Sequence, residues 1–189
     1  MPNRNKKTKS SDRNFLVGKK LALRGIEFED LNGPYLRWMN DPEVTRYLES
    51  ALFPNTRRRM ENFLKSVDNA QNVMFCILDR KTGSHVGNVK LGPIQWIHRT
   101  SNFGILIGDK RFWGKGYATE ATNLVLEYAF NKLNLNKVNL GFVAEHKAAA
   151  AVYKKLGFKI EGRTRQQFHS NGRYLDVIQM GLLKEEFKK

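Results

Sequence analysis

The chain has 189 residues, 41% of them hydrophobic and 11% aromatic, which suits one domain with a normal core and argues against two. Its longest apolar runs are far too short to span a membrane and no secretory leader opens the sequence, so we expect a cytoplasmic protein. The formal net charge of +15 favours an anionic partner and fits a polycationic ligand poorly.

Residues 1–14 are polar and basic, and they predict a disordered arm ahead of a single domain at residues 15–189. The arm carries a net charge of +4, so the rest of the chain still carries +11 of the +15. Nucleic acid is one candidate partner for so basic a chain. However, the aromatic residues are not interleaved with the basic ones in a nucleic-acid-binding motif, and a phosphorylated cofactor or substrate explains the sign of the charge equally well.

The first half of the chain predicts one strand, two helices and then three strands. The strands alternate apolar and polar residues or form short apolar runs, whereas the helices repeat apolar residues at helical spacing. Thr56 resembles the N-cap of the second helix, and the Asp41-Pro42 pair ends the first. The expected strands are 20–26, 73–78, 84–96 and 100–108, and the expected helices are 29–39 and 56–70, with 43–55 as a short helix or loop. Short links between the last three strands favour antiparallel pairing.

Our functional hypothesis depends on residues 109–130. Gly114 and Gly116 permit a tight turn, and a helix with one apolar stripe follows at once. The stripe consists of Ala121, Leu124, Val125, Tyr128 and Ala129. Because the first N–H groups of a helix have no internal partner, this turn suits a phosphate or pyrophosphate. The stretch matches neither a dinucleotide fingerprint nor a P-loop, and a glycine hinge before an ordinary surface helix is the alternative.

The remaining sequence predicts a strand at 137–144, a helix at 147–156 and two strands at 158–164 and 174–183, joined around the turn 170–172. The single cysteine, Cys76, lies in an apolar run, so we expect a buried reduced thiol and no internal disulfide. The four histidines show no metal-ligand spacing. We therefore predict no metal.

Three motifs occur along this order of elements. The first is Trp113-Gly114-Lys115-Gly116-Tyr117-Ala118, which continues so that residues 116–121 read GYATEA. The second is Tyr153 followed by Leu156-Gly157-Phe158, and the third is the segment WMNDPEV at 38–44. Together they resemble the GNAT superfamily of acetyl-CoA-dependent N-acetyltransferases over residues 18–184. They are most similar to the branch of ribosomal-protein and amino-sugar acetylases. Trp113 departs from the usual Arg or Gln, and His146 stands where Asn is usual.

The resemblance implies an α/β (α+β) fold with a mixed, mostly antiparallel central sheet of about seven strands flanked by about four helices. It implies transfer of an acetyl group from acetyl-CoA to a primary amine, with Tyr153 as the general acid. Without the family match, Tyr153 would be read as a core residue. The implied acetyl-CoA-binding residues are Ile105, Ile107, Trp113, Gly114, Lys115, Gly116, Tyr117, Ala118, Thr119 and His146, and the implied acceptor-binding residues are Trp38, Asn40 and Asp41. Core packing is the alternative for Ile105, Ile107 and Trp38, and a helix cap is the alternative for His146.

The general base and the acceptor stay open. The family's usual acid aligns with Gly141, which has no acidic group, so Glu145, Glu120, Asp41 or a water chain could replace it. A nucleotide-linked amino sugar is the favoured acceptor because a basic surface suits its phosphates. A protein N-terminus, a polyamine or another small amine is the alternative, and a non-enzymatic basic module that binds nucleic acid is the competing class. A monomer or a homodimer is expected.

Overall fold

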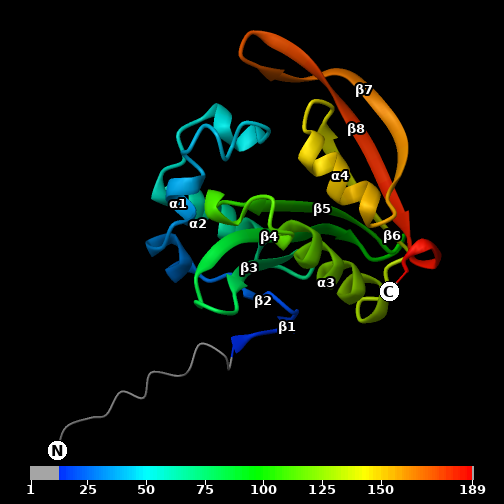
Figure 1. Cartoon of the computed structure of the whole chain (residues 1–189), viewed down its shortest axis with the longest axis horizontal. Helices are drawn as coiled ribbons and strands as arrows, with labels where there is room; N and C mark the ends of the chain where they lie inside the picture. Colours follow the sequence, from blue (N-terminus) through cyan, green and yellow to red (C-terminus); the bar gives the residue numbers. More distant parts are fainter. Residues whose placement is uncertain (1–12, 189) are drawn as a thin grey trace, which may run out of the picture.

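The computed structural model describes residues 13–188, which form one eight-stranded sheet with the order β1-β2-β3-β4-β5-β6-β8-β7 (Figure 1). Every neighbouring pair is antiparallel except β5 and β6, which are parallel. The strands are β1 (Leu16–Val17), β2 (Leu21–Gly25), β3 (Val73–Asp79), β4 (His85–Gln95), β5 (Thr100–Ile107), β6 (Lys137–Val143), β7 (Lys159–Ser170) and β8 (Arg173–Leu183). The mixed, mostly antiparallel sheet is confirmed, with eight strands instead of about seven.

The helices cover both faces of this sheet. The α-helices are α1 (Tyr35–Trp38), α2 (Arg57–Val67), α3 (Tyr117–Asn131) and α4 (Lys147–Lys155), and the short 3-10 turns are η2 (Phe28–Asn32), η3 (Glu49–Leu52), η4 (Lys110–Phe112) and η5 (Lys184–Glu186). Phe75 and Ile105 pack in the core under α3 and α4, whereas their neighbours Met74 and Leu106 pack against α1 and α2. Because adjacent strand residues point to opposite faces, the two helix pairs lie on opposite sides of the sheet.

The apolar stripe predicted for the central helix is buried. Ala121, Val125 and Ala129 are fully inaccessible, and Leu124 and Tyr128 pack against the same core cluster. Burying such a stripe contributes roughly 25 cal/mol for each Å² of apolar surface removed from water. This packing fixes where α3 begins, and therefore where its first-turn N–H groups lie.

Several element boundaries differ from the prediction. The helix expected at 29–39 is divided into η2 and α1 at Gly33-Pro34, because proline has no N–H to donate within a helix. The last two strands run to Ser170 and from Arg173, so their hairpin is longer than expected. Its turn residues Asn171 and Gly172 have positive φ of 49° and 74°, as a two-residue hairpin requires. Strand β1 was not predicted.

The basic arm expected at residues 1–14 lies outside the described residues except for its last two. Of these, Arg13 forms an exposed ion pair with Glu27, with Nη1 and Oε2 3.1 Å apart. Within residues 13–188, no helix has the length and apolar character that crossing a bilayer requires.

Candidate functional site

The site begins where β5 and β6 stop pairing. In the described part of the chain the two strands are in register only at Thr100 with Lys137, Ser101 with Val138 and Asn102 with Asn139. Strand β5 continues to residue 107 and β6 to residue 143, and each is paired on its other side with β4 or β8. Their facing edges beyond these three pairs therefore present backbone groups that an extended ligand can bind as an added strand would.

The direction of these backbone groups follows from the β4–β5 ladder. The Gly108 N–H donates to the Val86 carbonyl at 3.0 Å, and Leu106 pairs with Asn88. Because the groups of successive residues alternate between the two edges of a strand, those of Ile105 and Ile107 face away from β4, toward β6. Their side chains pack against the core. Ile105 and Ile107 can therefore contribute side chains to the core and backbone groups to a ligand at the same time.

The glycine-rich loop leads from the end of β5 into α3. Gly114 and Gly116 have φ of 69° and 82°, values that residues with a side chain rarely adopt, and Gly116 is the N-cap of α3. The first-turn N–H groups of Tyr117, Ala118 and Thr119 therefore have no helical partner and carry the positive end of the helix dipole. This is the geometry that binds phosphate at a helix N-terminus.

Two aromatic residues hold the loop in place. The Trp113 indole Nε1 donates to the Ile107 carbonyl at 2.7 Å, which ties the loop to the end of β5 and leaves the Ile107 N–H as the open group there. The Tyr117 side chain is buried, and its hydroxyl donates to Asp79 Oδ1 at 2.5 Å. Tyr117 can therefore serve a ligand through its backbone only. Lys115 is exposed, and its carbonyl accepts from Lys20 Nζ at 2.9 Å.

Tyr153 on α4 lies under the point where β5 and β6 separate. Its ring packs against those of Phe103 on β5 and Phe142 on β6, with ring centroids 6.4 and 5.7 Å apart. Only 7% of the residue is exposed. Burial raises the pKa of Tyr153 to about 12, so the hydroxyl keeps its proton at neutral pH. In the described structure that hydroxyl has no hydrogen-bond partner, as suits a proton donor to a bound ligand.

His146 lies at the N-cap of α4, two turns before Tyr153 and so on the same side of the helix. Its ring stacks on Tyr47 at 4.5 Å between centroids, which joins α4 to the segment between α1 and α2. Burial lowers the pKa of His146, and the nearby charge of Arg46 lowers it further. The imidazole is therefore neutral at pH 7, with one nitrogen to donate and one to accept a hydrogen bond.

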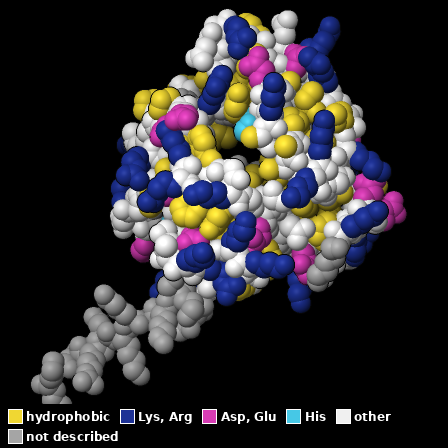
Figure 2. Space-filling model, in the orientation of Figure 1, with side chains coloured by type: hydrophobic (Ala, Val, Ile, Leu, Met, Phe, Trp, Pro, Cys, Tyr) yellow, Lys and Arg dark blue, Asp and Glu magenta, His cyan; other side chains and the backbone are white. Residues whose placement is uncertain are grey.

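A cavity of about 1000 Å³ lies between residues 39–54 and the tip of the β7–β8 hairpin. We call this cavity the acceptor pocket. It is lined by Met39, Asn40, Pro42, Glu43, Thr45, Arg46, Leu48, Leu52, Phe53, Pro54, Phe168, His169, Ser170, Asn171 and Gly172. Figure 2 shows that basic side chains are spread over this face of the molecule and that hydrophobic side chains surround a hollow near its centre.

Of the three predicted acceptor residues, Asn40 lines this pocket. Its side-chain Nδ2 donates to the Asn55 carbonyl at 2.9 Å, and its Oδ1 accepts from the Asn55 N–H at 3.0 Å. Asn40 therefore fixes the position of this part of the pocket wall. Trp38 is 4% exposed and packs beneath the site against His85 and Gly108. Asp41 accepts from the backbone of Glu43 and pairs with Lys110 Nζ at 2.9 Å. Trp38 and Asp41 are not among the residues that line the acceptor pocket.

The candidate bases all have partners. Hydrogen bonding from Lys110 holds the pKa of Asp41 below its usual range, which weakens Asp41 as a base. The Glu120 carboxylate accepts from the Lys20 backbone N–H at 2.8 Å, beside the loop rather than at the acceptor pocket. Glu145 pairs with Arg173 at 3.3 Å. Water remains as the fourth candidate for the proton acceptor.

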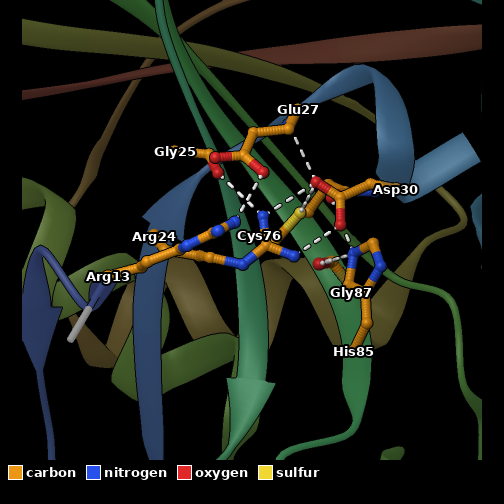
Figure 3. Close-up of polar contacts among 9 residues, drawn as sticks. Arg13, Arg24, Gly25, Glu27, Asp30, Cys76, His85 and Gly87 are labelled. Carbon is orange, nitrogen blue, oxygen red and sulfur yellow. Dashed lines mark hydrogen bonds and ion pairs between the residues drawn. The ribbon is translucent and has the colours of Figure 1, made fainter. Parts of the chain in front are cut away.

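One cluster brings together side chains that sequence spacing did not connect. Asp30, Cys76 and His85 place potential metal-ligating atoms within 4.8 Å of one another, and Figure 3 shows Arg24 gathered with them around Asp30. Both Asp30 oxygens accept from Arg24, at 2.5 and 2.8 Å, and Oδ2 also accepts from the Cys76 thiol at 3.2 Å.

These bonds compete with a metal for the Asp30 carboxylate and the Cys76 sulfur. His85 Nε2 lies 3.0 Å from the Gly87 carbonyl and 2.9 Å from Asn88 Oδ1, so its proton is already donated. Burial raises the pKa of Cys76, which keeps it a thiol, as expected from the sequence, whereas a metal would require the thiolate. The cluster is therefore a buried ion pair that attaches η2 to β2 and β3, and it does not suit a metal.

A second cavity, of about 480 Å³, adjoins the glycine-rich loop and contains residues that the sequence did not single out. Its lining combines the loop before β2, the first half of α3 and the end of α4. These segments lie about 100 residues apart along the chain, as the Lys20 to Glu120 hydrogen bond shows. The lining residues are Gly18, Lys19, Lys20, Gly116, Thr119, Glu120, Asn123, Leu124, Lys155 and Leu156.

Comparison with known proteins agrees with this geometry. The family model "Acetyltransferase (GNAT) domain" matches residues 20–159. A spermidine N(1)-acetyltransferase of Escherichia coli is 31% identical over 168 residues, which cover 88% of each chain. The crystal structure of a Vibrio cholerae spermidine N-acetyltransferase in complex with CoA and spermine superposes with a TM-score of 0.81 at 30% identity, covering 89% of this chain and 98% of that one. The chain therefore belongs to the GNAT family and is an acetyl-CoA-dependent N-acetyltransferase.

Proposed function

We propose that this enzyme acetylates the primary amine of a nucleotide-linked amino sugar. The observation that carries the proposal is the charge of the acceptor pocket. Glu43 is the single carboxylate among the described residues that line it, and its Oε2 is already bonded by Lys110 Nζ at 2.6 Å. Arg46 lines the same pocket and forms no ion pair within residues 13–188. A phosphate could pair with Arg46, whereas the one carboxylate of this lining already has a cationic partner and leaves a polycation no free acidic group.

The rim of the pocket also offers a surface for a flat, partly apolar group. Leu52 and Phe53 are 62% and 60% exposed, and the Arg59 guanidinium lies 5.1 Å from the centre of the Phe53 ring. An exposed aromatic face beside arginines can stack a nucleobase and bind a diphosphate, because guanidinium groups match phosphate oxygens in geometry and charge. These features support an acceptor that carries a nucleotide.

The roles of the site residues follow from their positions. The backbone N–H groups of 114–119 would bind the pyrophosphate of acetyl-CoA, and the open edge of β5 at Ile105 and Ile107 would bind its pantetheine arm. His146 would hydrogen-bond the same arm. Placing the thioester above Tyr153 would hold it for attack by an amine from the acceptor pocket.

Attack by the neutral amine would form the N–C bond and give a tetrahedral intermediate with a negative oxygen and a positive nitrogen. Its collapse breaks the C–S bond, and Tyr153 would protonate the departing sulfur as the general acid. The amine loses one proton to water or to a base. The products are an N-acetylated amine and free CoA.

Spermidine is the second candidate acceptor, because the relatives named above are spermidine acetyltransferases and one of them was crystallised with spermine. Those names belong to those proteins. In this chain the single pocket carboxylate is already paired with Lys110, which it shares with Asp41, so the described lining offers one carboxylate for several ammonium groups.

The test is the release of CoA thiol from acetyl-CoA with three acceptors: a nucleotide-linked amino sugar, spermidine and a peptide with a free N-terminus. We expect kcat/KM to be highest for the amino sugar and to fall about tenfold in Arg46→Glu, since a charge-assisted bond to phosphate is replaced by repulsion. Lys81→Glu, an equal charge reversal in the exposed β3–β4 turn, is the matched control. A higher kcat/KM for spermidine would refute this acceptor.

A further inference from the structure

The β7–β8 hairpin extends beyond the rest of the sheet. Among the described residues, β8 pairs with β6 only as far as Val177, which lies opposite Val143. The remainder of the hairpin, residues 165–176, therefore projects past the sheet, as Figure 1 shows. Its tip at 168–172 lines the acceptor pocket opposite residues 39–54. One wall of the pocket thus depends on the direction in which this projecting part points.

The projecting part contains a bulge in β7. Three residues of β7, 165–167, lie opposite one residue of β8, between the pairs Thr164–Val177 and Phe168–Leu175. The two extra residues give β7 about 7 Å more length than β8 over this interval. A bulge bends its strand and increases the local twist, and bulges are common beside active sites, where they re-aim a side chain. This bulge therefore sets the direction of the hairpin tip.

The single β8 residue opposite the bulge is Asp176, and its carboxylate holds the bulge. Its Oδ1 accepts from the Gln166 N–H at 2.8 Å, and its Oδ2 accepts from Arg163 Nε at 2.5 Å. Gln166 has a positive φ of 51°, which residues with a side chain rarely adopt, so this conformation must be stabilised by its surroundings. The bond from the Gln166 N–H, followed by that from Arg163, holds the pKa of Asp176 below its usual value, so the carboxylate is charged at neutral pH.

Asp176 also attaches the bulge to the body of the protein. Its backbone carbonyl accepts from the Ala144 N–H at 2.9 Å, directly after the end of β6. The next residue, Glu145, pairs with Arg173 at 3.3 Å, close to the hairpin turn. On the tip side of the bulge, Phe168 is only 8% exposed and lines the acceptor pocket, and it belongs to neither core cluster of the described residues. Phe168 is therefore part of the pocket wall and not of the central core.

From this arrangement we infer that Asp176 is a positioning residue for acceptor recognition. It fixes the bulge at residues 165–167, and the bulge places Phe168 and the hairpin tip as one wall of the acceptor pocket. Asp176 acts through the backbone of Gln166, because the Arg163 side chain is 63% exposed and an ion pair so accessible to water contributes little. The inference rests on the proposed role of this cavity as the acceptor pocket, but it holds for whichever amine the enzyme acetylates.

The test compares Asp176→Ala with Asp176→Asn in the full chain, by thiol release and by calorimetry with CoA. Asp176→Ala removes the bond to the Gln166 N–H, so the KM for the acceptor should rise about tenfold. The affinity for CoA should stay within about twofold, because the proposed cofactor-binding residues lie outside the hairpin, and Tm should fall by less than about 5 °C. Asp176→Asn keeps an oxygen that accepts from Gln166 and loses only the charge opposite Arg163. Its acceptor KM should stay within about threefold of the unmodified value.

Two further variants separate the bend of the hairpin from its charge. Glu161→Ala removes a comparable ion pair, to Lys137 at 2.8 Å, at the base of the same strand, and should leave the acceptor KM unchanged. Deletion of Gln166 and Gln167 leaves one residue opposite Asp176 and so removes the excess length of β7. We expect this deletion to raise the acceptor KM at least as much as Asp176→Ala, with CoA still bound.

An acceptor KM within about threefold of the unmodified value in Asp176→Ala or in the deletion variant would overturn the inference. An equal rise in Asp176→Asn, or an equal loss of CoA affinity, would overturn it as well. Each KM is measured with the nucleotide-linked amino sugar and with spermidine. If spermidine alone is acetylated, the proposed acceptor is wrong, and the spermidine KM of the same variants still decides the role of Asp176.

Discussion

Replacing Tyr153 with Phe removes one oxygen atom and tests the proposed general acid. The ring packs against Phe103, Phe142 and Phe158, and these contacts do not involve the hydroxyl. No hydrogen bond within the described structure is lost, so the free energy of unfolding should change by less than about 0.5 kcal/mol. A general acid typically contributes about 10² to 10⁴ in rate. We therefore expect kcat to fall at least about 100-fold.

The assay is steady-state thiol release with acetyl-CoA varied at saturating acceptor. The KM for acetyl-CoA should change by less than about threefold, because the hydroxyl acts on the departing sulfur and not on cofactor binding. Tyr128→Phe is the matched control: Tyr128 is a half-buried tyrosine on α3 that packs against Phe15 and Phe75, away from the site. An unchanged kcat in Tyr153→Phe would refute the assignment, and an equal loss in the control would attribute the effect to packing.

Three further changes test the loop, the histidine and the buried ion pair. Gly116→Glu should abolish CoA binding in calorimetry, because it puts a side chain at a φ of 82° and an anion where pyrophosphate should bind; unchanged affinity would contradict the loop assignment. His146→Asn, which restores the residue usual in the family, should keep the KM for acetyl-CoA within about threefold of the unmodified value. His146→Leu should raise this KM about tenfold through loss of a hydrogen bond. Equal KM values in the two variants would exclude a hydrogen bond from His146 to the cofactor. Asp30→Asn should lower the free energy of unfolding by about 3 kcal/mol at pH 7 in urea titrations, because it leaves Arg24 without its charged partner. Burial raises the pKa of Asp30, but bonds from Arg24, the Glu27 backbone and Cys76 outweigh it and hold the pKa below its usual value. The difference in free energy of unfolding between the unmodified protein and Asp30→Asn should therefore be fully present above about pH 5. It should shrink as the pH falls through the ordinary pKa of about 4 toward the lower pKa that Asp30 has in the folded state. A difference that grows in acid would refute this reasoning.

The sequence predicted the fold well wherever one local pattern decided the structure. The stripe from Ala121 to Ala129 identified α3, and the pair Gly114 and Gly116 identified the turn before it, because periodicity and positive φ leave clear marks in a sequence. The prediction failed at 29–39, where apolar spacing continued across Gly33-Pro34 although the helix did not.

The parts of the site that the sequence could not reveal depend on contacts between distant segments. Lys19 and Lys155 line one cavity because the fold brings the loop before β2, α3 and the end of α4 together, and the Glu120 hydrogen bond joins the first two. In the same way, Asp30, Cys76 and His85 meet although no spacing connects them. Side-chain partners also decide roles: Asp41 remained open as a base until the structure paired it with Lys110.

The high positive charge of this chain is consistent with the chemistry as well as with the binding of phosphates. Only a neutral amine attacks a thioester, yet a primary ammonium group has a pKa near 10 in water. A positive field lowers the pKa of an ammonium group bound within it, so Arg46 beside the acceptor pocket would favour loss of that proton. The same field would repel a free amine cation unless its carrier brings negative charge. An acceptor whose amine and phosphates belong to one molecule satisfies both conditions, whereas spermidine satisfies only the first.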